Sequence, residues 1–86
     1  MKSYIYKTKG VCSREIHIEI DENNVITSAR YVGGCSGNTQ GVAALVVGMS
    51  VDEAISRLSG IKCGMKSTSC PDQLAIALTE IKENKI

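Results

Sequence analysis

Residues 15–20 alternate strictly between polar and apolar side chains, with Ile16, Ile18 and Ile20 on one side of the segment. Successive side chains of a β-strand point to opposite faces of the sheet, so this alternation predicts a strand with one buried face. Residues 4–6 and 25–32 also have strand character, and residues 21–24 are a cluster of turn-forming Asp, Glu and Asn. The first third of the chain is therefore expected to form a three-stranded antiparallel sheet.

The periodicity changes from that of strands to that of helices after residue 34. Residues 42–47 are apolar almost all round, which predicts a buried helix that ends near Gly48. Ser50 and Glu53 match the pattern of a capping box, and apolar residues follow at helical spacing as far as Leu58. A second helix is therefore expected to begin directly after Ser50.

A third helix is expected to open at Pro71, because proline favours the first helical position. Its apolar face is formed by Leu74, Ala77, Leu78 and Ile81. Strands followed by helices predict an α+β fold, with about three helices packed on one face of the small antiparallel sheet. Residues 1–86 are expected to form one domain.

Length and composition restrict the function of such a domain. The 86 residues include neither Phe nor Trp, so the core is expected to be marginal and to need a staple such as a metal, disulfides or a partner subunit. The net charge is +1, and the basic residues form no stripe along the sequence, so no nucleic-acid partner is predicted. The longest apolar run is 42–47, and residues 1–7 lack the apolar core of a signal peptide. A cytoplasmic protein without a membrane segment is expected.

Four cysteines, Cys12, Cys35, Cys63 and Cys70, lie between the predicted elements and have small or polar neighbours. Four thiolates suit either a tetrahedral zinc ion or an iron–sulfur cluster, and this ligand set does not separate the two. Cys35 and Cys70 each precede a predicted helix, where the positive end of the helix dipole favours a thiolate. The sequence therefore predicts one metal centre formed by all four cysteines.

Other interpretations of the cysteines stay open. A single loop cysteine is often just a small buried apolar residue, and disulfides are disfavoured by the absence of a secretion signal. Exposed thiolates would also suit thiol–disulfide exchange or the transfer of a metal cluster. The only histidine, His17, falls on the polar face of a strand and is expected to be solvated rather than a ligand. No catalytic residue is predicted, because no nucleophile–base constellation is evident.

The glycine-rich segment 33–41 has a second interpretation. A glycine-rich turn that leads into a helix can bind an anion or a nucleotide phosphate, here through Gly34, Ser36, Gly37, Asn38 and Thr39. The segment lacks the Lys-Ser/Thr of a P-loop and does not fit G-x-G-x-x-G, so the signal is weak. Space for a metal ligand at Cys35 explains the glycines at least as well.

Residues 68–72 read TSCPD, and residues 33–38 read GGCSGN. With the four cysteines, these motifs make nearly the whole chain similar to the small stand-alone branch of the TSCPD-domain family. Relatives of this domain occur at the C-terminal end of adenosylcobalamin-dependent ribonucleotide reductases, and stand-alone members are often labelled ribonucleoside-diphosphate reductases. Since 86 residues cannot hold a radical-generating barrel, the resemblance implies a non-catalytic accessory in deoxyribonucleotide synthesis, with a reductase as a candidate protein partner.

The order of strands, cysteines and helices also resembles, more distantly, the U-type iron–sulfur cluster scaffolds. The resemblance implies the same fold, a nascent cluster on Cys12, Cys35 and Cys70, and a cluster recipient as partner. Arg14 stands where the scaffolds have an Asp, Ser69 stands where they have a His, and Cys63 is additional. These departures favour a closed, permanently held metal over a transferable cluster. The oligomeric state is left open.

Overall fold

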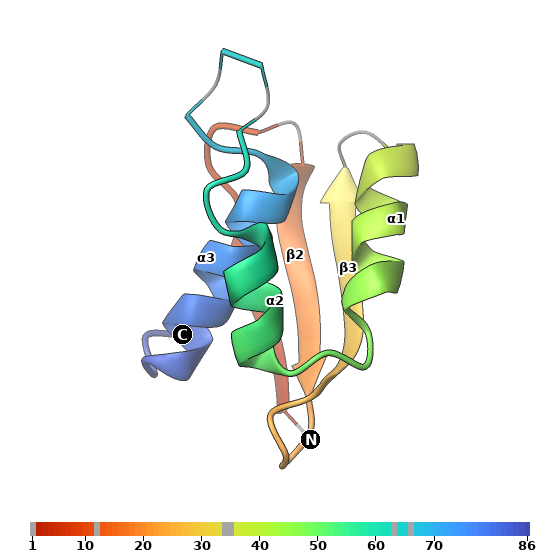
Figure 1. Cartoon of the computed structure of the whole chain (residues 1–86), viewed down its shortest axis with the longest axis vertical. Helices are drawn as coiled ribbons and strands as arrows, with labels where there is room; N and C mark the ends of the chain where they lie inside the picture. Colours follow the sequence, from red (N-terminus) through yellow and green to blue (C-terminus); the bar gives the residue numbers. More distant parts are fainter. Residues whose placement is uncertain (1, 12, 34–35, 63, 66) are drawn as a thin grey trace.

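In the part of the chain that the structure describes, three strands are followed by three helices (Figure 1). The computed structural model describes residues 2–11, 13–33, 36–62, 64–65 and 67–86, and for residues 36–38 it describes the backbone alone. The predicted α+β architecture is confirmed, with somewhat longer elements than the sequence pattern indicated. In chain order the elements are β1 (Lys2–Lys7), β2 (Ser13–Ile20), β3 (Ile26–Gly33), α1 (Ser36–Val46), α2 (Val51–Leu58) and α3 (Cys70–Lys82).

The sheet is antiparallel throughout, with β2 between β1 and β3. The three alternating isoleucines of β2 all point into the core, as expected: Ile16 and Ile18 are completely buried and Ile20 nearly so. The turn between β2 and β3 is held by the Asp21 carboxylate, whose Oδ1 accepts hydrogen bonds from the backbone amides of residues 23 and 25. The register therefore follows from one buried stripe and one well-formed turn.

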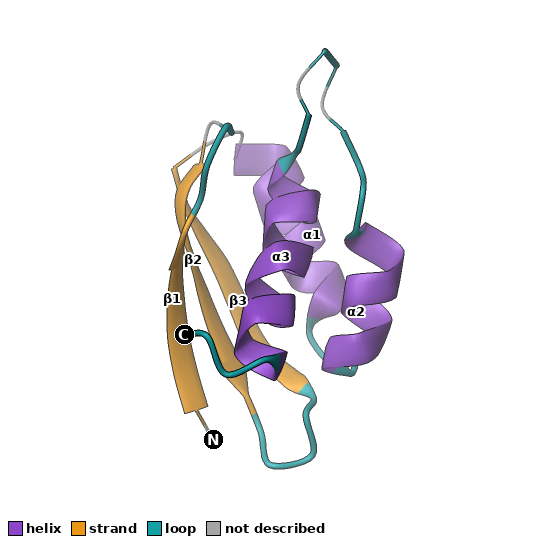
Figure 2. Ribbon diagram, turned by 90° about the vertical axis from the view of Figure 1, so that its left-hand side faces the viewer, coloured by secondary structure: helices purple, strands orange, loops and turns teal. Residues whose placement is uncertain are grey.

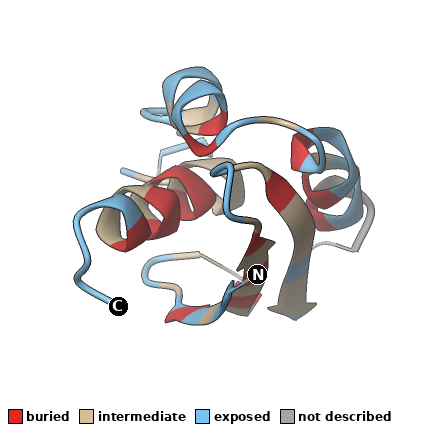
Figure 3. Ribbon diagram, turned by 90° about the horizontal axis from the view of Figure 1, so that it is seen from below, coloured by how far each residue is buried: buried red, intermediate tan, exposed pale blue. Residues whose placement is uncertain are grey.

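All three helices lie on one side of the sheet (Figure 2). Helix α1 packs on the edge strand β3, α3 lies across the sheet, and α2 packs on α3, on the side away from the sheet (Figure 3). Two backbone hydrogen bonds, from Ile26 N to Met49 O and from Val51 N to Asn24 O, tie the α1–α2 connection to the β2–β3 hairpin. The opposite face of the sheet carries His17 with its cross-strand neighbours Arg30 and the exposed Ile5.

The predicted helix starts are confirmed within a residue for α2 and α3. Ser50 caps α2 by accepting a hydrogen bond from the Glu53 amide at 3.1 Å, as the capping box predicted, while the Glu53 carboxylate contacts Arg57. Helix α3 begins at Cys70, one residue before the predicted Pro71. Gly60 adopts a φ of +83°, a left-handed conformation that suits glycine, directly after the end of α2.

The prediction of a helix buried on all sides is wrong for α1. The helix begins at Ser36, and over residues 39–46 only one side of it reaches the core. Val46 is 1% exposed, whereas its neighbour Leu45 is 72% exposed. Helix α1 lies at the edge of the fold, and α2 packs on α3 rather than on α1. The outer face of α1 is therefore left open (Figure 3).

The core lies between the sheet and α3 and is built almost entirely from aliphatic side chains. Among the described residues, no buried side-chain nitrogen or oxygen lacks a hydrogen-bond partner. No helix in the described part of the chain is long and apolar enough to cross a membrane. The buried cluster consists of Tyr6, Ile16, Ile18, Ile20, Ile26, Val46, Val51, Ala54, Leu74, Ala77, Leu78 and Ile81.

Candidate metal centre

The motif at residues 68–72 forms the junction between the α2–α3 loop and the first turn of α3. Ser69 is the N-cap residue: its Oγ accepts a hydrogen bond from the Asp72 amide at 3.1 Å and donates one to the carbonyl oxygen of Ile61 at 2.6 Å. Asp72 accepts a hydrogen bond from the Gly60 amide at 2.7 Å and another from the Thr68 hydroxyl. These contacts fasten both ends of the loop to the start of α3.

Gln73, the residue after the motif, connects this junction to the β1–β2 loop. Its Oε1 accepts hydrogen bonds from the Lys9 amide at 3.0 Å and from the Tyr6 hydroxyl at 3.4 Å. Its Nε2 donates to Thr68 Oγ1 at 3.1 Å. Gln73 is 4% exposed. One buried carboxamide therefore joins the first strand, the β1–β2 loop and the start of the motif.

Cys70 opens α3 as a half-buried free thiol. Its Sγ lies 3.3 Å from the Oγ of Ser13, which is 3% exposed, and its carbonyl oxygen accepts a hydrogen bond from the Tyr31 hydroxyl at 2.9 Å. Burial, with a smaller effect of the nearby Cys70, raises the pKa of Tyr31 and keeps its hydroxyl protonated as a donor. Strands β2 and β3 therefore both contact the start of α3 at this residue.

Of the four predicted cysteine ligands, the structure describes only Cys70. Cys12, Cys35 and Cys63 lie outside the described residues, as does Gly34 of the predicted anion-binding turn. Across the described ranges, which leave out these three cysteines, no three His, Cys, Asp or Glu residues are grouped as a metal site requires.

The described segments next to the predicted ligands meet at one end of the sheet (Figure 1). Ser13, the residue after Cys12, begins β2 and pairs across the sheet with Gly33, which lies two residues before Cys35. Helix α1 begins at Ser36, directly after Cys35. Ile61, two residues before Cys63, is bound to Ser69 at the start of α3. Three separate stretches of the chain, at Ser13, Gly33 and Ile61, thus come close to the start of α3.

The remaining residues of the predicted anion-binding turn belong to α1. Ser36, Gly37 and Asn38 form the first turn of the helix backbone, and their side chains are outside the described part. Thr39 is 5% exposed and lines a cavity between α1 and β3, so it faces the sheet.

The sequence did not identify Ser13, Tyr31 or Gln73 as parts of this region. For Gln73 a signal was present, because it lies four residues before Ala77 on the apolar face of α3, where a polar residue needs a partner. Ser13 and Tyr31 have no such signal, since their contacts depend on how β2 and β3 meet α3. Ser69, interpreted at first only as a departure from the scaffold pattern, has a structural role as the helix cap.

His17 lies on the open face of the sheet, as predicted. Its Nε2 is 3.1 Å from the Glu15 carboxylate, and its Nδ1 is 3.5 Å from the Arg30 guanidinium. These partners occupy both ring nitrogens on the face of the sheet opposite to the helices.

A comparison with protein-family models matches the TSCPD domain over residues 2–82, which is nearly the whole chain. Neither the curated proteins nor the solved structures gave a significant match. The matched range includes every strand and helix of the fold, together with the Thr68–Asp72 junction whose hydrogen bonds are described above. The chain therefore belongs to the TSCPD-domain family.

Proposed function

We propose that this protein binds one metal centre, a zinc ion or an iron–sulfur cluster, through Cys12, Cys35, Cys63 and Cys70. The observation that carries the proposal is the contact between Ser13 and Cys70, with Ser13 also paired to Gly33 in the sheet. Cys12 adjoins Ser13, and one residue separates Gly33 from Cys35. Consecutive Cα atoms are 3.8 Å apart, and this short connection to Ser13 and Gly33 supports the inclusion of both cysteines in a site with Cys70.

The chemistry around Cys70 suits a thiolate ligand. The Ser13 hydroxyl is positioned to donate a hydrogen bond to Sγ, and the sulfur lies at the N-terminal end of α3, where the helix dipole favours negative charge. The hydrogen bonds of Ser69, Asp72 and Gln73 hold the adjoining loops in place. A bound metal would add the folding energy that a small aliphatic core lacks.

With four thiolates on zinc, the site would be closed and its role structural, because no coordination position is left for water or substrate. We therefore infer a non-catalytic accessory domain. Membership of the TSCPD family supports a link to deoxyribonucleotide synthesis, with a reductase as the candidate partner. The nucleotide-binding interpretation of the glycine-rich turn predicts heat of binding at millimolar ligand. Isothermal titration with nucleoside di- and triphosphates tests it.

Single Cys→Ser variants test the ligand set, with His17→Ala as the matched control because it removes the only histidine. The proposal predicts that each cysteine variant, purified without oxygen, loses most of its bound metal and that His17→Ala keeps it. Retention of metal by any of the four cysteine variants would remove that residue from the ligand set. Equal retention by all four would refute the proposed centre.

The half-exposed free thiol of Cys70 also supports a second candidate, a cluster carrier or a thiol-redox protein. The two functions differ in access to the sulfur atoms. Rapid alkylation of Cys70 in the native protein favours an open, working thiol. Protection that ends when a chelator is added favours the closed metal site.

A further inference from the structure

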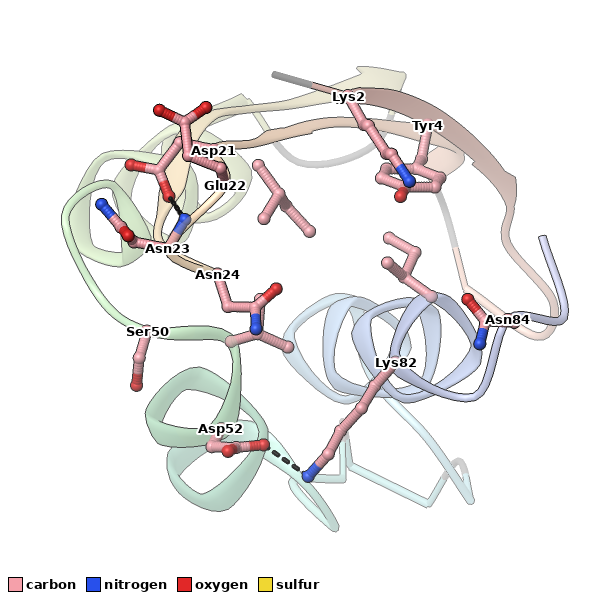
Figure 4. A pocket seen from close by; sticks show the side chains of 13 residues that line it. Lys2, Tyr4, Asp21, Glu22, Asn23, Asn24, Ser50, Asp52, Lys82 and Asn84 are labelled. Carbon is pink, nitrogen blue, oxygen red and sulfur yellow. Dashed lines mark hydrogen bonds and ion pairs between the residues drawn. The ribbon is translucent and has the colours of Figure 1, made fainter.

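A second site lies at the other end of the molecule from Cys70. A cavity of about 640 Å³ opens between the β2–β3 turn, the first strand and the helices α2 and α3 (Figure 4). Its volume is within the range of small-molecule sites, roughly 300–1,000 Å³. None of its lining residues belongs to the predicted metal centre, so it requires a separate explanation.

The inner surface of the cavity is apolar. Ile20 from β2, Val51 from α2 and Ile81 from α3 line it, and all three belong to the core cluster. Each is at least nine-tenths buried, so the cavity reaches down to the core at the point where the two helices diverge from the sheet. An apolar group placed there would remove these side chains from water.

The rim of the cavity carries solvent-accessible hydrogen-bond donors that pair with no other group in the described part of the chain. Lys2 occupies the same inward-facing side of β1 as Tyr4 and Tyr6, and at this end of the strand its side chain extends over the cavity (Figure 4). Within the described part of the chain, neither the Lys2 ammonium, the Tyr4 hydroxyl nor the Asn84 carboxamide makes a hydrogen bond or ion pair. The cavity thus combines an apolar base with solvent-accessible donors that no described protein group occupies.

The acidic groups at the rim are already satisfied. The Asp21 carboxylate accepts two backbone amides of its own turn, and Asp52 pairs with Lys82 at 2.6 Å (Figure 4). Glu22 also has an interaction partner. The groups at the rim that remain available to a ligand are therefore mainly donors, and they favour a hydrogen-bond acceptor with negative charge.

We propose that this cavity binds a small organic carboxylate with an apolar body. The carboxylate accepts hydrogen bonds from Lys2, Tyr4 and Asn84, and the apolar body covers Ile20, Val51 and Ile81. A carboxylate without the body would leave the base of the cavity wet, and a cation with the same body would meet the Lys2 ammonium. Both halves of the ligand are therefore needed for binding.

The probe for this site is 4-phenylbutyrate, followed by chemical-shift changes in the isotope-labelled protein. A Kd of roughly 1–10 mM is expected for a ligand of this size. Acetate tests the need for the apolar body, and 4-phenylbutylamine, which has the same body and the opposite charge, tests the need for the anion. The shifts are expected around the lining residues for 4-phenylbutyrate alone.

Lys2→Gln removes the charge and is expected to weaken 4-phenylbutyrate binding about tenfold. Tyr4→Phe removes only a neutral hydroxyl and is expected to weaken it about threefold. Lys7→Gln is the matched control, because Lys7 is an exposed lysine at the opposite end of the same strand, and it should bind as the wild type does. The spectra of the variants without ligand report whether they are folded.

Four results would overturn the proposal. They are unchanged binding in the folded Lys2→Gln variant, equal binding of 4-phenylbutylamine, shifts that map away from the cavity, and no binding of 4-phenylbutyrate at about 50 mM, well above the expected Kd. Because the metal content of the protein is measured independently, failure of this site leaves the proposed metal centre untouched.

Discussion

The Ser13 hydroxyl lies 3.3 Å from the Sγ atom of Cys70, although 57 positions separate the two residues in the chain. Ser13 begins the central strand and Cys70 begins the last helix, so the contact joins the sheet to the helical layer at one end of the fold. The family motif surrounds the same point, with Ser69 as helix cap and Asp72 as acceptor for the preceding loop.

Ser13→Ala removes the hydroxyl that faces the sulfur and leaves the thiol in place. If Cys70 is a metal ligand, the loss of this outer hydrogen bond should speed metal transfer to a chelator about tenfold. A colorimetric chelator assay measures this rate. Ser56→Ala, an exposed position on α2, is the matched control and should transfer metal at the wild-type rate. Equal rates for the two variants would exclude a role for Ser13 at the metal.

Gln73→Met keeps the length of the side chain and removes all three of its hydrogen bonds. The free energy of unfolding should fall by about 2–4 kcal/mol, because the Lys9 amide and the Thr68 hydroxyl lose a buried partner. Urea denaturation measures the change. Gln40→Met on the exposed side of α1 is the control and should change stability by less than about 1 kcal/mol. A similar small effect at Gln73 would show that the carboxamide does not hold the loops.

Tyr6 makes the stability depend on pH in the alkaline range. Burial, aided by the negative charges of Glu80 and Asp72, raises the pKa of Tyr6 above its usual value of 10.0. The folded state therefore keeps the proton that the unfolded chain loses, so this stabilisation is complete below pH 10 and is lost as the pH rises through the raised pKa.

Tyr6→Phe should accordingly lose less stability than the wild type between pH 9 and pH 11, as measured by urea denaturation at each pH. At neutral pH the variant should lose about 1 kcal/mol, since the bond to Gln73 is long, at 3.4 Å. Tyr4→Phe serves as the control for removal of a tyrosine from the same strand. An alkaline loss in Tyr6→Phe as steep as in the wild type would contradict this assignment.

Two adjacent residues of α1 should respond very differently to truncation. Val46→Ala leaves a cavity in the core and should cost about 1–3 kcal/mol of unfolding free energy. Leu45→Ala removes a larger side chain from an exposed position and should cost less than about 0.5 kcal/mol. Thermal or urea unfolding of both variants makes the comparison. Equal losses would mean that the outer face of α1 is covered in solution.

Which side of α1 is buried could not be predicted from the sequence. Local signals were sufficient where one residue type determines the backbone: the isoleucines of β2, the Ser50 cap and Pro71 at the start of α3 all correspond to observed features. For α1, residues 42–47 indicated only that the helix is apolar. Which side of it is buried depends on where α2 packs, and that is a tertiary property.

The candidate site, too, has residues that the local sequence identifies and residues that depend on the tertiary structure. Cys70 was identified from its residue type and its place before a proline. Ser13 and Tyr31 were not, because nothing in their local sequence indicates that two strands meet the start of α3 there. Their roles follow from the sheet register, which brings Ser13 opposite Gly33 and Tyr31 opposite Ile16.

The metal content and the absorption spectrum of freshly purified protein, prepared without oxygen, test the central claim most directly. The proposed centre predicts about one zinc ion per chain in a colourless protein, or iron and sulfide with visible absorption in a brown one. Less than about a tenth of a metal ion per chain would contradict it, because a tight thiolate site keeps most of its metal during purification.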